Sequence, residues 1–215
     1  MEESFLDSKS NKIFFSIGKY DLPDFSIFDS EKPDDFIIWQ PDTFYVVLGR
    51  GNQPETALNF ENIISDRVKI LKRPSGGETV VLSPKMLVVA VKISIRENEK
   101  IKSIFEPVNK IIIQTLLEFG VENLSIRGIS DICIGNKKIL GSSAYRKPDR
   151  IFYHAVLNIS EDIAVFEKYL KHPVREPEYR VGRSHKEFVT SLFAENNFID
   201  TQQLYDALFQ NFKLL

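Results

Sequence analysis

Residues 73–77, Arg-Pro-Ser-Gly-Gly, have the composition of a loop that binds an anion. Two glycines in succession let the backbone adopt positive φ and let a ligand approach the main-chain N–H groups. The arginine that precedes them can aim its forked donors at a carboxylate or a phosphate. A hairpin turn would have a similar composition, so this stretch by itself leaves both interpretations open.

Asp131 and Lys138 form a second candidate site. Two short apolar strands surround a Gly-Asn turn in residues 131–141, which predicts a tight hairpin. The ammonium of Lys138 is a compact point charge. On composition alone, a solvated lysine at a strand end is favoured, and Asp131 either orients Lys138 or caps a strand.

Cys133 is the single cysteine of the chain. It lies between two isoleucines inside a strand, so a small buried core residue is favoured over a reactive thiol, which would need a lowered pKa. One cysteine excludes an intrachain disulfide and a cysteine metal cluster. The three histidines lack the mutual spacing of zinc ligands, so no metal site is predicted.

The composition indicates a protein of one large domain or two small ones, with enough length for a real core. The 28 basic residues nearly balance the 30 acidic ones, so no global charge favours nucleic acid or an anionic membrane. No apolar run reaches the length of a membrane span. We expect a cytoplasmic protein, which agrees with the scarcity of cysteine.

Apolar patterning predicts mixed strands and helices without βαβ regularity, which indicates an α+β fold. Strands are expected at 36–39, 44–49, 68–71, 79–82, 87–93, 132–134, 138–141 and 152–159, with 79–82 pairing with 68–71. Helices are expected at 57–66, 103–120 and 160–170, with two further helix starts at Ser184 and Asp200. Residues 1–35 are expected to form an irregular lead-in with at most one strand.

Four pieces of the chain, in order, resemble the lipoate–protein ligase and octanoyltransferase superfamily, whose catalytic fold is shared with biotin–protein ligases. Residues 73–77 match its Arg-x-Ser-Gly-Gly stretch, and 131–143 match its Asp-to-Lys-to-Gly-Ser strand pair. Residues 46–53 are similar to its Val-φ-Gly-Arg-x-Gln element, with one residue more. Residues 153–157 stand where the family has a His-His-Gly-Thr-Leu strand.

The resemblance implies one catalytic domain at 36–215, with 1–35 as a lead-in belonging to it, built from mixed or antiparallel sheets flanked by helices. It implies that the two motif stretches face one another across an acyl pocket, with Lys138 and Asp131 as catalytic residues. The residues that it implies for binding the acyl group or its adenylate are Arg50, Asn52, Arg73, Ser75, Gly76, Gly77, Gly141, Ser142 and His154.

The function implied is attachment of a lipoyl or octanoyl group, through an acyl-adenylate, to a lysine of a lipoyl carrier domain. ATP with Mg²⁺ and lipoate or octanoate would be substrates, and no bound metal cofactor is expected. The carrier would be the acyltransferase subunit of a 2-oxoacid dehydrogenase or a glycine-cleavage H protein.

Departures from the family pattern leave two other functions open. Glu78 replaces a third glycine, while Leu82 and Met86 replace a histidine and an asparagine. An ATP-independent octanoyl or lipoyl transferase, which would have to use Cys133, is one alternative. A catalytically silent relative that binds a lipoyl domain or acyl ligand is the other. Only a short stretch follows Leu192, so an accessory C-terminal domain is expected to be absent or to be supplied by a separate polypeptide.

Overall fold

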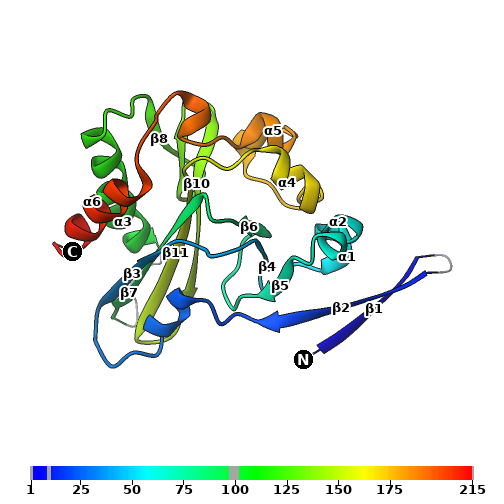
Figure 1. Ribbon diagram of the computed structural model, residues 1–215. Helices are drawn as coiled ribbons and strands as arrows, with labels where there is room; N and C mark the ends of the chain where they lie inside the picture. Colours follow the sequence, from blue (N-terminus) through cyan, green and yellow to red (C-terminus); the bar gives the residue numbers. More distant parts are fainter. Residues whose placement is uncertain (1, 9–10, 97–101, 215) are drawn as a thin grey trace.

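Two β-sheets assembled from distant segments form the framework of the protein (Figure 1). The computed structural model describes residues 2–8, 11–96 and 102–214. The first sheet has the order β1-β2-β5-β4-β6, from the strands β1 (Glu2–Ser8), β2 (Asn11–Lys19), β5 (Lys69–Lys72), β4 (Tyr45–Leu48) and β6 (Val80–Leu82). The second has the order β3-β7-β11-β10-β9-β8, from the strands β3 (Asp35–Trp39), β7 (Met86–Ser94), β11 (Arg150–Asn158), β10 (Lys137–Arg146), β9 (Asp131–Ile134) and β8 (Leu124–Arg127).

Helices flank both sheets, which confirms the predicted α+β class. The α-helices are α1 (Pro54–Ala57), α2 (Phe60–Ser65), α3 (Lys102–Glu118), α4 (Ala164–Tyr169), α5 (His185–Phe188) and α6 (Thr201–Phe212). Short 3₁₀ helices are η1 (Pro23–Ile27), η2 (Glu178–Arg180) and η3 (Phe193–Glu195). The predicted helix starts are confirmed, since Ser184 makes a capping box with Glu187 and Asp200 accepts a bond from the N–H of Gln203. Within the described ranges, none of the helices combines the length and the apolar character needed to cross a membrane.

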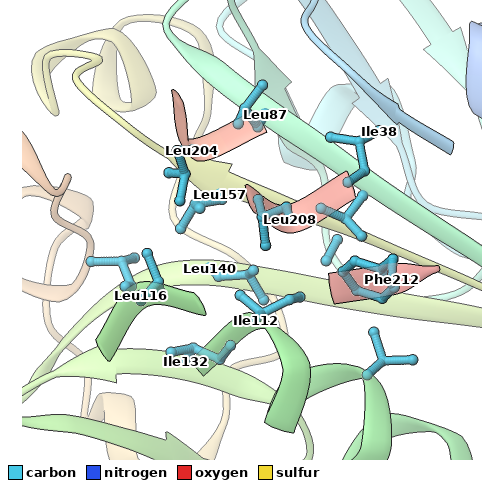
Figure 2. Close-up of a cluster of buried hydrophobic side chains, with 14 of the residues drawn as sticks. Ile38, Leu87, Ile112, Leu116, Ile132, Leu140, Leu157, Leu204, Leu208 and Phe212 are labelled. Carbon is cyan, nitrogen blue, oxygen red and sulfur yellow. The ribbon is translucent and has the colours of Figure 1, made fainter. Parts of the chain in front are cut away.

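Strand β7 is buried on both faces because it lies in the middle of the molecule. Leu87, Val89 and Val91 face α3 and α6, whereas Val88 and Ala90 face the other way. Figure 2 shows the helix side of this core, where Leu208 and Phe212 of α6 lie among side chains of α3 and the second sheet.

A second apolar layer joins the two sheets to each other. It is built from alternate residues of each strand, namely Tyr45, Val47, Leu71 and Leu82 of the first sheet with Trp39 and Val88 of the second. The other faces of β4, β5 and β6 turn Val46, Ile70 and Val81 towards α2 and α4. This alternation fixes which side chains lie between the sheets, and the candidate site lies there.

Three details of the expected fold were wrong. The lead-in is not irregular, because β1 and β2 form an antiparallel hairpin that reaches out from the body, and the end of β2 pairs with β5 (Figure 1). Strand β6 does not pair with β5, since the fully buried β4 lies between them, parallel to β5 and antiparallel to β6. The helix expected at 57–66 is two short helices, separated where Leu58 makes a β-bridge with Leu170.

Truncation of Leu208 tests the packing of α6. The side chain is fully buried, so Leu208→Ala removes apolar contacts and leaves a cavity, and we expect it to lower the free energy of unfolding by about 2–5 kcal/mol. Gln210→Ala, at an exposed position of the same helix, is expected to change it by at most about 0.5 kcal/mol. Urea melts of both variants make the comparison, and equal effects would contradict the docking of α6.

Candidate functional site

The glycine loop, residues 75–78 between β5 and β6, lies against the inner face of the second sheet. Ser143 and His154 are direct cross-strand partners on β10 and β11. The Ser143 hydroxyl donates to the carbonyl of Gly76 at 2.7 Å, and His154 Nε2 lies 2.7 Å from the Ser75 hydroxyl. Two polar side chains of one sheet therefore hold a loop that belongs to the other.

Arg73 lies beneath the glycine loop and gives the loop its shape. Its side chain is buried, the residue being 4% exposed, and it donates to Ser75 Oγ (3.0 Å) and to the carbonyls of Val47 (3.1 Å), Gly76 (2.7 Å) and Glu78 (2.8 Å). These bonds occupy four of the five N–H groups of the guanidinium. Burial lowers the pKa of Arg73 to about 10, so the group stays charged at neutral pH. Arg73 was predicted to bind the ligand, yet its donors are used within the protein.

The backbone of the glycine loop turns its carbonyl groups inward. The Ser75 carbonyl accepts from the N–H of Arg50 at 2.9 Å, and those of Gly76 and Glu78 accept from Arg73. Gly77 has a φ of 82°, which a glycine adopts without strain. Within the described parts of the chain, the N–H groups of Gly76 and Gly77 donate to no protein acceptor. These N–H groups are the donors that the loop keeps available for an anion.

A neighbouring loop after β4 fits closely around the glycine loop. A Cβ atom at Gly49 would lie 2.0 Å from the carbonyl oxygen of Gly77, so only glycine fits there. Asn52 joins the two loops, since its Oδ1 accepts from the N–H of Gly49 (2.9 Å) and its Nδ2 donates to Glu78 Oε2 (3.2 Å). The side chain of Arg50 is exposed, and its backbone makes the contact with the glycine loop.

Lys138 and Asp131, which were predicted as catalytic residues, form an ion pair on the second sheet. Lys138 Nζ lies 3.5 Å from Asp131 Oδ2 and 5.1 Å from the centre of the Phe188 ring. The Lys138 side chain is 26% exposed, so the ammonium is partly shielded yet reachable. A Cβ atom at Gly141 would lie 3.4 Å from Lys138 Nζ, so the lysine side chain runs over the backbone of Gly141.

A β-bulge brings Lys138 to the same face as the glycine loop. The register of β10 against β9 shifts between Lys138 and Leu140, and both Ile139 and Leu140 enter the core on the helix side. Lys138 and Gly141 consequently face the other way, together with Ser143. Gly141 and Ser143 are two residues apart, which is roughly 7 Å along a strand. The lysine and the glycine loop thus meet on one short piece of β10.

Ser142, predicted as a binding residue, faces the helix side of the sheet instead. Its hydroxyl donates to Ser130 Oγ at 2.7 Å, and its cross-strand partner is Ala155, a core residue. The structure does not bring Ser142 together with Lys138, because the bulge assigns that face to Gly141 and Ser143. Ser143 is the residue that reasoning from the sequence missed.

Tyr179 completes the surroundings of Asp131, although it was not among the predicted site residues. Its hydroxyl donates to Asp131 Oδ2 at 2.6 Å, and burial together with Asp131 raises the pKa of the phenol. Cys133 Sγ lies 3.7 Å from the same hydroxyl. Cys133 is fully buried, which confirms the favoured interpretation of it as a core residue, and burial raises the pKa of its thiol. A thiol in this state is not an activated nucleophile.

Comparison with known proteins identifies the family. The profile described as "Lipoyl protein ligase A/B catalytic domain" matches residues 26–213. The chain belongs to this family. Lipoate-protein ligase A of Psychrobacter cryohalolentis is 26% identical over 200 residues, which cover 87% of this chain and 54% of that protein. The chain therefore spans about half the length of this relative.

Two solved structures share the fold of this family member. A bi-partite lipoate protein ligase, described with its E2 lipoyl domain from Thermoplasma acidophilum, superimposes with a TM-score of 0.75 at 18% identity, covering 88% of this chain and 74% of that one. A lipoate-protein ligase A bound with ATP gives a TM-score of 0.71 at 19% identity, covering 86% and 73%.

Glu78 marks a departure of this member from the family pattern, and its surroundings moderate its charge. The carboxylate is partly buried, which raises its pKa, whereas the Asn52 hydrogen bond and the charges of Arg175, Arg73 and Arg180 lower it. Arg180 is itself buried, and in the described structure its Nη2 has no hydrogen-bond partner. Three arginine side chains therefore act on the one carboxylate of Glu78.

Asp24 and Tyr20 extend the site into the lead-in, where no sequence signal marked them. His154 Nδ1 lies 3.2 Å from Asp24 Oδ2, and the Tyr20 hydroxyl donates to Asp24 at 2.8 Å. Burial lowers the pKa of His154, although Asp24 opposes the shift, so the ring is neutral at pH 7. The predicted residue His154 thus contacts the glycine loop on one side and the lead-in on the other.

Substitution at Gly49 tests the fit of the two loops. We expect Gly49→Ala to displace the carbonyl of Gly77 and to quicken hydrogen exchange at the Arg50 amide, which donates to the glycine loop, at least tenfold. Gly51→Ala is the matched control, because no atom lies within 4 Å of a Cβ at Gly51. Amide exchange spectra of both variants make the comparison, and unchanged exchange in Gly49→Ala would contradict the close fit of the two loops.

Proposed function

We propose that this chain is a lipoate–protein ligase that joins lipoate or octanoate to a lysine of a lipoyl carrier domain by way of an acyl-adenylate. One observation carries the proposal. The Lys138 ammonium, paired with Asp131 at 3.5 Å, shares a face of β10 with the glycine loop, whose N–H groups at Gly76 and Gly77 are available to an anion.

The first step of the proposed reaction joins two anions. A carboxylate oxygen of the acyl group attacks the α-phosphorus of ATP, supplied as its Mg²⁺ complex, and pyrophosphate leaves. The fixed Lys138 ammonium lowers the repulsion between the carboxylate and the phosphate. The N–H groups of Gly76 and Gly77 are suited to hold the anionic end of the acyl group, as backbone concavities do.

The second step transfers the acyl group to the carrier. The neutral amine of the carrier lysine attacks the acyl carbonyl, an amide bond forms, AMP leaves, and the proton of the amine passes to solvent. Lys138, partly exposed, is placed where it can polarise that carbonyl as negative charge develops on its oxygen. Asp131 and Phe188 restrict the lysine to this position.

Glu78 is compatible with a bound nucleotide in this proposal. The carboxylate accepts from Asn52, and the charges of Arg73, Arg175 and Arg180 act on it. Its repulsion of a phosphate is therefore reduced by nearby cations, as Coulomb's law requires.

The proposed partner is a lipoyl carrier domain, either the acyltransferase subunit of a 2-oxoacid dehydrogenase or a glycine-cleavage H protein. The Thermoplasma relative, described as bi-partite and with an E2 lipoyl domain, supports such a carrier and an accessory subunit as partners. We place the reaction in the cytoplasm, where a lone cysteine stays reduced.

Mass spectrometry of a lipoyl domain tests the reaction. We expect the wild-type protein to acylate the domain when lipoate or octanoate and Mg-ATP are present. Lys138→Ala is expected to slow this at least 100-fold, as loss of one preorganised transition-state donor does. Lys137→Ala is the matched control, because the neighbouring Lys137 forms an exposed ion pair with Glu195 and is expected to stay within twofold. Modification only from an acylated carrier would favour the transferase, and binding without any mass shift would favour a silent relative.

Substitution of the cysteine separates the ligase from a thiol transferase. Cys133 is the single cysteine, it is buried, and its thiol pKa is raised. We therefore expect Cys133→Ser to retain at least half of the ATP-dependent rate in the same assay. Abolished transfer in a variant with an unchanged melting temperature would refute the ligase mechanism.

A further inference from the structure

Four side chains form a buried relay that reaches from the lead-in to the glycine loop. Asp24 Oδ2 lies 3.2 Å from His154 Nδ1, His154 Nε2 lies 2.7 Å from Ser75 Oγ, and Ser75 Oγ accepts from Arg73 Nε at 3.0 Å. All four residues are at most 8% exposed. Tyr20 adds a hydroxyl donor to Asp24 at 2.8 Å.

Each bond of the relay has one direction. An ionised Asp24 only accepts hydrogen bonds, so Nδ1 of His154 carries the proton and Nε2 is an acceptor. The Ser75 hydroxyl then donates to Nε2, and its lone pairs are left for the N–H of Arg73. The neutral state of His154, favoured by burial, agrees with this assignment. The relay places a negative charge at Asp24 and a positive charge at Arg73, joined through neutral groups.

The connectivity is that of a Ser–His–Asp triad, but its use is different. A nucleophilic serine must reach its substrate, whereas Ser75 has no exposed surface and receives a hydrogen bond from a cation. That bond draws electron density away from the oxygen. The geometry therefore suits the orientation of a loop rather than attack on a carbonyl.

We propose that Asp24 and His154 are positioning residues for the glycine loop. By fixing the direction of the Ser75 hydroxyl they hold Arg73, and Arg73 holds the carbonyls of Gly76 and Glu78 inward, which leaves the loop N–H groups facing the ligand. The identity of that ligand, an acyl carboxylate or its adenylate, rests on the proposed function. The inference that Asp24 and His154 hold the loop in position does not depend on that function.

Asp24→Asn is the decisive variant because it preserves shape and removes the charge. Its amide can donate to Nδ1, so the proton of His154 moves to Nε2 and Ser75 loses its acceptor. Proton–nitrogen spectra of the imidazole are expected to show the Nδ1–H form in the wild type and the Nε2–H form in the variant. Hydrogen exchange at the Arg50 amide, which donates to the Ser75 carbonyl and so reports on the loop, is expected to quicken at least tenfold, and kcat/KM for the acyl acid to fall at least tenfold.

Two tyrosine variants provide a milder test and its matched control. Tyr20→Phe removes the hydroxyl that donates to Asp24, and we expect faster loop exchange with a smaller loss of kcat/KM. Tyr153 precedes His154 on β11, and its side chain lies on the other face of the sheet. Tyr153→Phe removes its buried hydroxyl, which donates to Asn109. It is expected to leave both loop exchange and kcat/KM within twofold, even if it lowers the melting temperature.

The outcomes separate this inference from the proposed function. An Nε2–H tautomer in the wild type, or unchanged loop exchange and kcat/KM in Asp24→Asn and Tyr20→Phe, would overturn the positioning role. If no acyl transfer occurs in the wild type, the proposed function fails, yet the tautomer and the loop exchange still decide the inference. The melting temperature could also fall equally in Asp24→Asn, Tyr20→Phe and Tyr153→Phe while loop exchange stays unchanged. That result would indicate a merely structural role for Asp24 and would overturn the positioning role.

Discussion

The buried positive charge of Arg73 is the constraint on which the site depends. A guanidinium out of contact with water is tolerated only when its hydrogen bonds are satisfied and its charge is countered. The carbonyls of Val47, Gly76 and Glu78 provide the bonds, and the relay through His154 leads to the carboxylate of Asp24. Four segments that are distant in the chain are thereby fixed relative to one another, and Ser143 and Asn52 hold the loop from its other sides.

Strand β10 brings the two halves of the site together. Its bulge places Lys138, Gly141 and Ser143 on one face, where Ser143 holds the glycine loop and the lysine runs over Gly141. A regular strand would alternate strictly and would turn either the lysine or the serine towards the helices. A single register shift therefore allows a buried apolar core on one side and a charged site on the other.

The sequence predicted most of the strands after residue 35 and the hairpin of β9 and β10, but not β8, the hairpin of β1 and β2, or the contacts made by the tertiary fold. Asp131 and Lys138 could be named in advance because the family pattern has an aspartate and a lysine on either side of a tight turn; in the structure the turn pairs Lys138 with Cys133, two residues from Asp131. Ser142 was chosen because the family pattern has a serine directly after the glycine, and no sequence signal marks the bulge that turns Ser143 to the site instead. The pairing of β6 with β4, and the contact of Asp24 with His154, join residues far apart in the chain, so neither periodicity nor turn chemistry contains them. Tyr179 was not assigned to the site because its contact with Asp131 joins residues 48 positions apart in the chain.

The Asp131 carboxylate acts on both Lys138 and Cys133, and its effect differs between a lysine-assisted ligase and a thiol-based transferase. Asp131 pairs with the Lys138 ammonium at 3.5 Å and holds the lysine in place. Burial raises the pKa of the Cys133 thiol and Asp131 raises it further, whereas the Tyr179 hydrogen bond and the charge of Lys138 lower it, and the balance leaves the pKa raised. A transferase would need the reverse arrangement, with a cation next to an exposed thiol. The environment of β9 and β10 is therefore suited to lysine-assisted chemistry on an acyl phosphate and unsuited to a thioester intermediate.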